Sequence, residues 1–200
     1  MPTAFNQSLW GDESFSAILS MKSLPDLIKI ISHDTSPPLW NLFEWVAFRF
    51  FGTGEIVIRS LSLIFYLTAA FFIYKIAVHY WNRKTALLAL GLTLFNPFLF
   101  SYAFEGRMYS IMAAGVAASM YFFIKRKWVP YVIASLFALY THHFAIFAIF
   151  VQGLWFIFEF FFGDRKAGVS MFKSFIAIGI GYAPWLLPNL PLRSLHRVQF

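Results

Sequence analysis

Two short segments of this sequence carry residue types suited to acid–base chemistry and to anion binding. In the first, Asp12 and Glu13 follow Trp10-Gly11. A carboxylate held here could take the proton of an acceptor hydroxyl as its oxygen attacks, with Asp12 as the general base and Glu13 as its neighbour. The structural alternative makes Asp12 the N-cap of a helix and places Glu13 in the first turn, where it complements the helix dipole.

The second segment is the short turn Glu105-Gly106-Arg107-Met108-Tyr109. The guanidinium fork of Arg107 matches phosphate oxygens, which makes Arg107 a candidate clamp for a phosphate at headgroup depth. Glu105 could orient Arg107 or a substrate hydroxyl. The alternative is interfacial, with Arg107 among lipid headgroups and Tyr109 in the belt of aromatic residues at the membrane surface.

Histidines supply two further candidates. His33 and Asp34 precede a Pro-initiated helix, where they could bind a divalent cation or a phosphate-bearing substrate. His142 and His143 are adjacent, so at most one of them is expected to point at a shared site. A metal site at His33, Asp34 or His143 would leave the identity of the metal open. The alternative is that all four are polar loop residues.

The composition shows where these segments must be held. Hydrophobic residues make up 60% of the 200 residues and charged residues 12%, whereas soluble domains carry about 25% charged residues. The net charge of +7 comes from short basic clusters between apolar runs, as in membrane proteins. The sequence lacks the basic stripe that is typical of nucleic-acid-binding proteins, so nucleic acid is not an expected partner. The absence of Cys excludes thiolate nucleophiles and thiolate metal sites.

The sequence therefore predicts an all-α integral membrane protein with two regions. Residues 1–56 form an extracytoplasmic loop with two amphipathic juxtamembrane helices. The first contains Phe15, Ile18 and Leu19 and continues past Lys22 to Lys29; the second begins with Ser36 as N-cap and ends at Gly52. Residues 57–200 form a bundle of about six transmembrane helices. The six predicted spans cover residues 57–78, 85–102, 109–124, 128–140, 144–162 and 169–188.

The loops between these spans predict the orientation. Basic residues cluster in the loops 82–84, 125–127 and 164–166, which alternate along the chain and so share one side, the cytoplasmic side. The two turns 103–108 and 141–143 and the first 56 residues then share the opposite side, which puts Asp12 and Arg107 on the same side of the membrane. Because Met1 starts on that side with no preceding span, we expect the chain to be truncated at its N-terminus, and its basic end suggests that more sequence follows.

The order of these motifs resembles the bacterial glycosyltransferases of family 39, which are membrane glycosyltransferases of the C type (GT-C). The resemblance rests on Ser8–Glu13, on residues 33–39, on the Glu105–Tyr109 turn and on residues 141–144. It implies inverting transfer of a sugar from a polyprenyl-phosphate donor to an acceptor (protein, lipid or glycan) on the extracytoplasmic face. Asp12 maps onto the presumed base of the family and Glu13 onto its partner. Together with the shared side, the resemblance implies that Asp12 and Arg107 meet. Thr35 and Ser36 separate Asp34 from the prolines, unlike the commoner form of that motif.

Further expectations follow from the same resemblance. The donor lipid and the surrounding membrane lipids are the expected partners, no cofactor is certain, and a divalent metal stays an open option. The competing hypotheses are a polytopic transporter or lipid-handling protein and a non-catalytic membrane assembly factor. An outer pocket ringed by Asp12, Glu105 and Arg107 would favour glycosyl transfer, whereas a polar path through the bilayer would favour transport.

Overall fold

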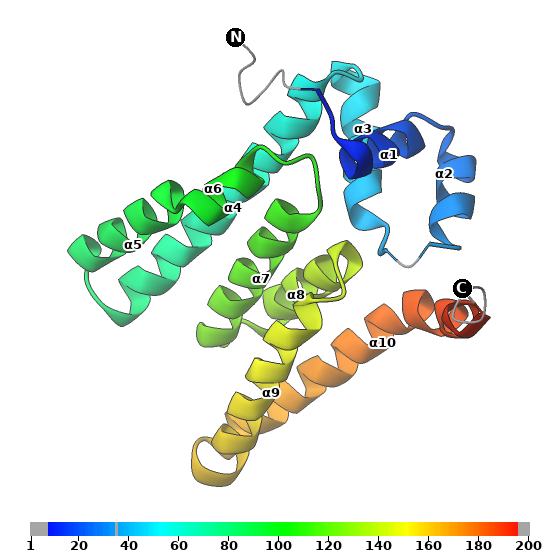
Figure 1. Ribbon diagram of the computed structural model, residues 1–200. Helices are drawn as coiled ribbons and strands as arrows, with labels where there is room; N and C mark the ends of the chain where they lie inside the picture. Colours follow the sequence, from blue (N-terminus) through cyan, green and yellow to red (C-terminus); the bar gives the residue numbers. More distant parts are fainter. Residues whose placement is uncertain (1–7, 35, 196–200) are drawn as a thin grey trace.

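The chain forms a helical bundle with three shorter helices packed across one end (Figure 1). The computed structural model describes residues 8–34 and 36–195, with side chains up to Leu186, and every regular element in this part is helical. The helices are α1 Gly11–Ser20, α2 Leu24–Ile31, α3 Leu39–Phe51, α4 Glu55–Tyr80, α5 Arg83–Phe95, α6 Pro97–Ala103, α7 Tyr109–Ile124, α8 Trp128–Thr141, α9 Ala145–Phe162 and α10 Arg165–Leu195. We call the end that holds α1–α3 the outer end and the end with the basic turns the inner end.

Within residues 8–34 and 36–54, the region before α4 contains three helices rather than the two predicted. The first predicted helix is interrupted between α1 and α2, because the Ser23 side chain accepts a hydrogen bond from the Asp26 amide and Pro25 stands in the first turn of α2. Ser36 is not the N-cap of α3, since that position is Pro38 and no side chain caps the helix. The end of α3 at Gly52 is as predicted, and Gly52 has the positive φ of 87° that glycine adopts without strain.

All six apolar segments predicted as spans are helical, but they differ in length. Three helices are long and apolar enough to cross a membrane: α4, α9 and the part of α10 over Arg165–Leu186. The helices α7 and α8 have 16 and 14 residues, or about 24 and 21 Å, which is short of the hydrocarbon thickness of about 30 Å. The described residues thus support three or four crossings, and six stays a prediction.

The second predicted span is bent rather than continuous. The helices α5 and α6 meet at an angle of 66°, so the pair is either one broken span, which would be the fourth crossing, or a re-entrant segment. The break lies at Asn96-Pro97, because the proline ring cannot continue α5 and the Asn96 side chain caps α6 by accepting a hydrogen bond from Leu99 N at 3.0 Å. This bend carries α6 back toward the outer end of α4 (Figure 1).

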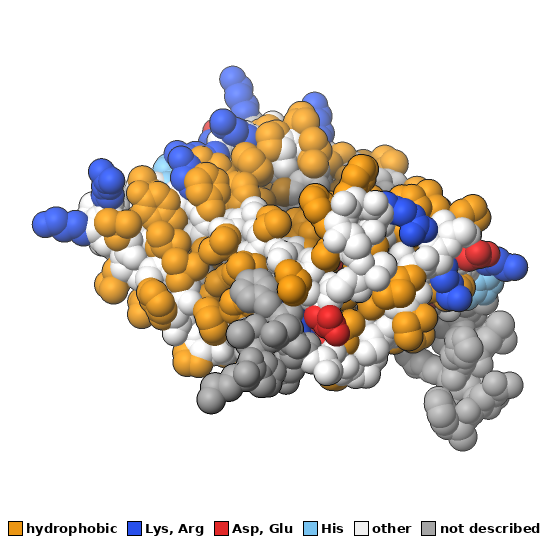
Figure 2. All heavy atoms as spheres, turned by 90° about the horizontal axis from the view of Figure 1, so that it is seen from above, with side chains coloured by type: hydrophobic (Ala, Val, Ile, Leu, Met, Phe, Trp, Pro, Cys, Tyr) orange, Lys and Arg blue, Asp and Glu red, His pale blue; other side chains and the backbone are white. Residues whose placement is uncertain are grey.

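Three apolar cores lie within the described residues, and the smallest of them packs α2 against α1 and α3 around Leu27. The two larger cores hold the bundle together. One joins α7 to α8, α9 and α10 around the buried Tyr131 and Met171. The other joins α1, α3, α4 and α7 around Trp40, Ile58 and Ile111, and it supports the outer end. Large apolar side chains stay exposed elsewhere, above all on α5 and α9, and hydrophobic side chains cover much of the face in Figure 2. Exposed apolar surface of this extent is expected where a protein faces lipid.

Candidate functional site

Asp12 and Arg107 meet at the outer end, although 95 residues separate them. Arg107 Nη2 lies 3.3 Å from Asp12 Oδ2, and Nη1 donates a hydrogen bond to the Asp12 carbonyl at 3.2 Å. The Asp12 side chain is 60% exposed and that of Arg107 only 17%. The expected contact between the two motifs is therefore present, with the carboxylate accessible and the arginine mostly enclosed.

Glu13 is the buried centre of this site. Its Oε1 accepts a hydrogen bond from Gly106 N at 2.6 Å, and its Oε2 accepts one from Trp10 N at 3.3 Å and faces Arg59 Nη2 at 3.5 Å. The carboxylate thus ties the start of α1 to the 105–107 turn and to α4. Glu13 lies in the first turn as predicted, but the N-cap of α1 is Trp10 rather than Asp12.

The turn itself is held tightly against α4. Ser62 Oγ donates a hydrogen bond to the Glu105 carbonyl at 2.6 Å. Gly106 packs so closely that an added Cβ would lie 2.4 Å from Ile58 Cγ2 and 3.3 Å from Glu13 Oε1. A side chain at this position would separate the turn from Glu13, so the glycine is needed for the close approach rather than for its backbone angle.

Glu105 faces a cavity of about 510 Å³ that we call the outer cavity. Its lining consists of Ser8, Trp10, Glu13, Arg59, Phe100, Ser101, Phe104 and Glu105. Burial raises the pKa of the half-buried Glu105 carboxyl, the nearby carboxylates of Glu13 and Asp12 raise it further, and Arg107 lowers it in part. The Glu105 carboxylate makes no hydrogen bond or ion pair with another described residue.

A second buried acid, Glu44 on α3, joins α3 to α1. Glu44 Oε2 accepts hydrogen bonds from Ser16 Oγ at 2.5 Å and Ser20 Oγ at 3.0 Å, and Trp40 Nε1 and Asn41 Nδ2 donate to the same Ser16 hydroxyl. Burial raises the pKa of Glu44 to about 8, against the lowering effect of the two serines. This network fixes the helix that carries Asp12.

The histidine candidates lie in different places. His33 is exposed just after α2, where its Nδ1 lies 2.8 Å from the Lys29 carbonyl. The imidazole therefore caps the C-terminal end of α2. His142 accepts a hydrogen bond from Phe144 N at 3.0 Å and its ring lies 6.2 Å from that of Tyr109. Burial lowers the pKa of His142, and the positive charges of His143 and Arg107 lower it further.

His143 contacts α10. Its Nδ1 lies 2.8 Å from the hydroxyl of Tyr182 on α10, so the two adjacent histidines have different partners. Asp34 is half-buried just beyond α2. Within residues 8–34 and 36–195, no three His, Asp or Glu side chains gather as a metal site would require. The divalent ion proposed at His33, Asp34 or His143 thus stays an untested prediction.

The site contains two residues to which the sequence analysis gave no role, Arg59 and Glu44. Both are charged side chains inside apolar helical segments, and such residues commonly mark functional contacts in membrane proteins. That signal could have drawn attention to both. It could not have named Glu13 as the partner of Arg59, because the two are 46 residues apart.

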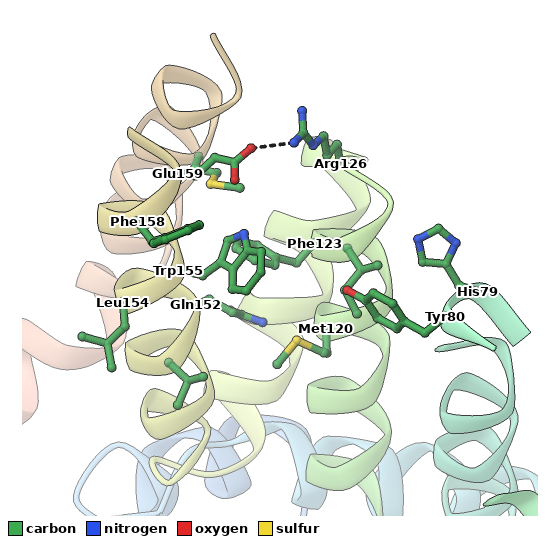
Figure 3. Close-up of a pocket in the computed structure, with 13 residues that line it drawn as sticks. His79, Tyr80, Met120, Phe123, Arg126, Gln152, Leu154, Trp155, Phe158 and Glu159 are labelled. Carbon is green, nitrogen blue, oxygen red and sulfur yellow. Dashed lines mark hydrogen bonds and ion pairs between the residues drawn. The ribbon is translucent and has the colours of Figure 1, made fainter. Parts of the chain in front are cut away.

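The inner end holds a different arrangement around a larger cavity of about 880 Å³ (Figure 3). Arg126 donates hydrogen bonds to Glu159 at 2.6 Å and to Asp164 at 2.9 Å, which ties the α7–α8 turn to the end of α9. Below this pair the lining is mostly apolar, with Met120, Phe123 and Trp155 between α7 and α9. None of the predicted site residues lines this cavity.

Comparison with known proteins identifies one family. The model of the family described as dolichyl-phosphate-mannose-protein mannosyltransferase matches residues 35–139, slightly more than half of the chain. The match includes Arg59, Glu105 and Arg107, whereas Asp12 and Glu13 precede it. No curated protein and no solved structure matches the chain.

Proposed function

Since the chain belongs to the dolichyl-phosphate-mannose-protein mannosyltransferase family, which consists of GT-C membrane glycosyltransferases, we propose that it transfers a sugar from a polyprenyl-phosphate donor to an acceptor hydroxyl at the outer end. The observation that carries this proposal is the meeting of Asp12 and Arg107 at 3.3 Å, with one group accessible and the other enclosed. The reaction needs both a general base for the acceptor hydroxyl and a cation for the leaving phosphate, and this contact brings one of each to the same site.

The proposed reaction is a single displacement. The acceptor oxygen attacks the anomeric carbon while Asp12 takes the hydroxyl proton, and the bond from that carbon to the phosphate oxygen breaks. Attack from the face opposite the leaving group inverts the anomeric carbon. Negative charge grows on the departing lipid phosphate, where Arg107 stabilises it. Arg107 Nε is buried and has no hydrogen-bond partner among the described residues, so the contacts with Asp12 leave part of the guanidinium unsatisfied.

The contacts of the two carboxylates distinguish their proposed roles. Glu13 is 1% exposed and its oxygens are taken up by Gly106, Trp10 and Arg59. A general base must reach the proton that it removes, so the exposed Asp12 is the better candidate. Glu13 then acts as a positioning residue that holds the Arg107 turn against α1.

The first test is Asp12→Asn, which keeps the side-chain shape and removes the basic oxygen. We expect transfer of a labelled sugar from polyprenyl phosphate to fall by roughly 100-fold or more, the usual contribution of a general base. The matched control is Asp26→Asn, another first-turn acid, on α2, which should leave transfer unchanged. Full activity of Asp12→Asn at normal protein levels would contradict the base assignment.

Transport is the competing function, and the arrangement of charge is less favourable to it. The charged contacts gather at opposite ends of α7, around Glu13 and Arg107 at the outer end and around Arg126 at the inner end. Between them, the polar contacts of Ser119 with Gln152 and Ser135 join neutral groups. An uptake or efflux assay on reconstituted vesicles is the direct test, and substrate-coupled flux without sugar transfer would favour transport.

A further inference from the structure

The outer cavity contains a carboxylate for which the proposed reaction has no use. Glu105 lines this cavity together with the aromatic side chains of Trp10, Phe100 and Phe104. Its volume of about 510 Å³ falls within the range of about 300–1,000 Å³ that is usual for small-molecule sites. The cavity lies on the α6 side of Glu13, whereas the exposed Asp12 is outside its lining.

The charge in the outer cavity argues against two kinds of ligand. Two carboxylates, Glu13 and Glu105, face one arginine, Arg59, and that arginine pairs with Glu13. A phosphate or another anion would meet a surplus of negative charge there. A plain hydrocarbon chain would bury the Glu105 carboxylate without a hydrogen-bond donor, which is unfavourable.

A ligand with many hydroxyl groups avoids both problems, because it carries no negative charge and it can donate hydrogen bonds to the Glu105 carboxylate. Ionised carboxylate oxygens accept hydrogen bonds from several donors, and hydrogen bonds to a charged acceptor are stronger than those between neutral groups. The faces of Trp10, Phe100 and Phe104 offer the apolar surface against which the C–H face of a sugar ring can pack. We infer that the outer cavity is a sugar-binding subsite in which Glu105 accepts hydrogen bonds from ring hydroxyls and Trp10 packs against the ring.

The position of the outer cavity relative to Arg107 fits this inference. Glu105 and Arg107 flank Gly106 on one turn, and two residues extend over about 7 Å at most. A phosphate at Arg107 and a sugar beside Glu105 are therefore within reach of one sugar-phosphate ligand. The inference rests on the proposed function only for the identity of the lipid that would bring the sugar.

The test compares two lipids on the protein in nanodiscs, polyprenyl phosphate and polyprenyl-phosphate mannose, by equilibrium binding. We expect the wild type to bind the sugar-bearing lipid about tenfold more tightly, as one or two hydrogen bonds to a charged acceptor would give. Glu105→Gln and Trp10→Leu should each reduce this preference to about twofold or less while leaving affinity for the bare lipid unchanged. Glu55→Gln and Trp81→Leu, which alter residues outside the outer cavity, should keep the full preference.

A full preference in both Glu105→Gln and Trp10→Leu would overturn the inference. If the wild type binds both lipids equally, the second measurement is a titration with methyl mannoside that follows tryptophan fluorescence. The signal from Trp10 is the part of the fluorescence change that is lost in Trp10→Phe. A saturable change would place an acceptor saccharide in the outer cavity, and no change would overturn the inference. An equal response to ethanolamine would also overturn it, because it would show only ionic attraction to Glu105.

These outcomes separate this inference from the proposed function. Arg107→Ala should weaken binding of both lipids equally, because the phosphate is common to them. A wild type that prefers the sugar-bearing lipid through Glu105 and Trp10, but never transfers the sugar, would keep the subsite and contradict the proposed function.

Discussion

The two ends of the bundle use the same chemistry in opposite ways. Each end has an arginine and carboxylates that tie helices together, Arg59 with Glu13 at the outer end and Arg126 with Glu159 and Asp164 at the inner end. The outer pair is almost wholly buried, at 5% and 2% exposure, whereas Arg126 is half exposed. At the outer end the neighbouring carboxylates of Asp12 and Glu105 keep accessible or unpaired oxygens, whereas at the inner end both carboxylates bind Arg126.

The difference indicates that the buried ion pair at the outer end positions carboxylates that stay accessible or unpaired. At the inner end the carboxylates are neutralised by Arg126 itself. A buried charge is costly if its partner is removed, and an exposed pair contributes little. Substitutions at the two ends should therefore differ in size, and the following predictions run from the largest expected effect to the smallest.

Glu13→Ala should be the most destabilising single change. It leaves Arg59 buried without its carboxylate and removes the acceptor for Gly106 N, so we expect a loss of about 3–5 kcal/mol in the free energy of unfolding. Unfolding by SDS in mixed micelles measures this value. Glu159→Ala at the inner end is the matched comparison, with about 1 kcal/mol or less expected because Arg126 is half exposed. Equal losses at the two ends would contradict the comparison.

The ion pair of Glu13 with Arg59 could not be predicted from the sequence, whereas the helices that carry it could. Apolar runs predicted the position of every long helix, including the bounds of α7, because burial against neighbours and lipid requires such runs. The breaks at Ser23-Leu24-Pro25 and Asn96-Pro97 carry cap-and-proline signals in the sequence, although the apolar runs around them predict continuous helices. The contact of Asp12 with Arg107 is expected from their shared side together with the family resemblance, whereas the pairing of Glu13 with Arg59 depends on how α1 packs on α4.

Glu44→Gln should change the pH dependence of stability at the outer end. The folded protein holds a proton on Glu44 up to about pH 8, whereas an unfolded chain releases it near the ordinary value of 4.5. Stability of the wild type therefore falls as pH rises between those two values, by roughly 2 kcal/mol between about pH 5 and pH 7. Glutamine has no proton to lose, so its unfolding curve should lack this component.

The measurement is SDS unfolding of both proteins across that pH range. We expect the variant to become the more stable of the two as pH rises, because glutamine can keep accepting the Ser16 and Ser20 hydrogen bonds. Parallel pH profiles would mean that Glu44 is ionised in the folded protein.

Gly106→Ala should reduce both stability and transfer. The added methyl group would lie 2.4 Å from Ile58 Cγ2, so the turn must move away from α4 and from Glu13. Overpacking of this kind costs about 1–3 kcal/mol, and it should also displace Arg107. Gly91→Ala on α5 is the control, because nothing lies within 4 Å of its added Cβ. Equal behaviour of the two variants would show that the close packing of the turn is unimportant.

The smallest effect is expected at Arg126, and it separates two opposing contributions. Arg126 has a positive φ of 52°, at the helix end where Lys127 N donates to the Phe122 carbonyl at 2.9 Å. Glycine adopts this conformation more easily than any other residue, by about 1 kcal/mol. The half-exposed ion pairs of Arg126 should also contribute about 1 kcal/mol at most. Arg126→Gly should therefore be close to neutral, whereas Arg126→Ala, which loses the ion pairs and keeps the strain, should cost about 1 kcal/mol. A large loss in both variants would mean that the inner ion pairs matter as much as the buried outer pair, and the contrast between the two ends would not hold.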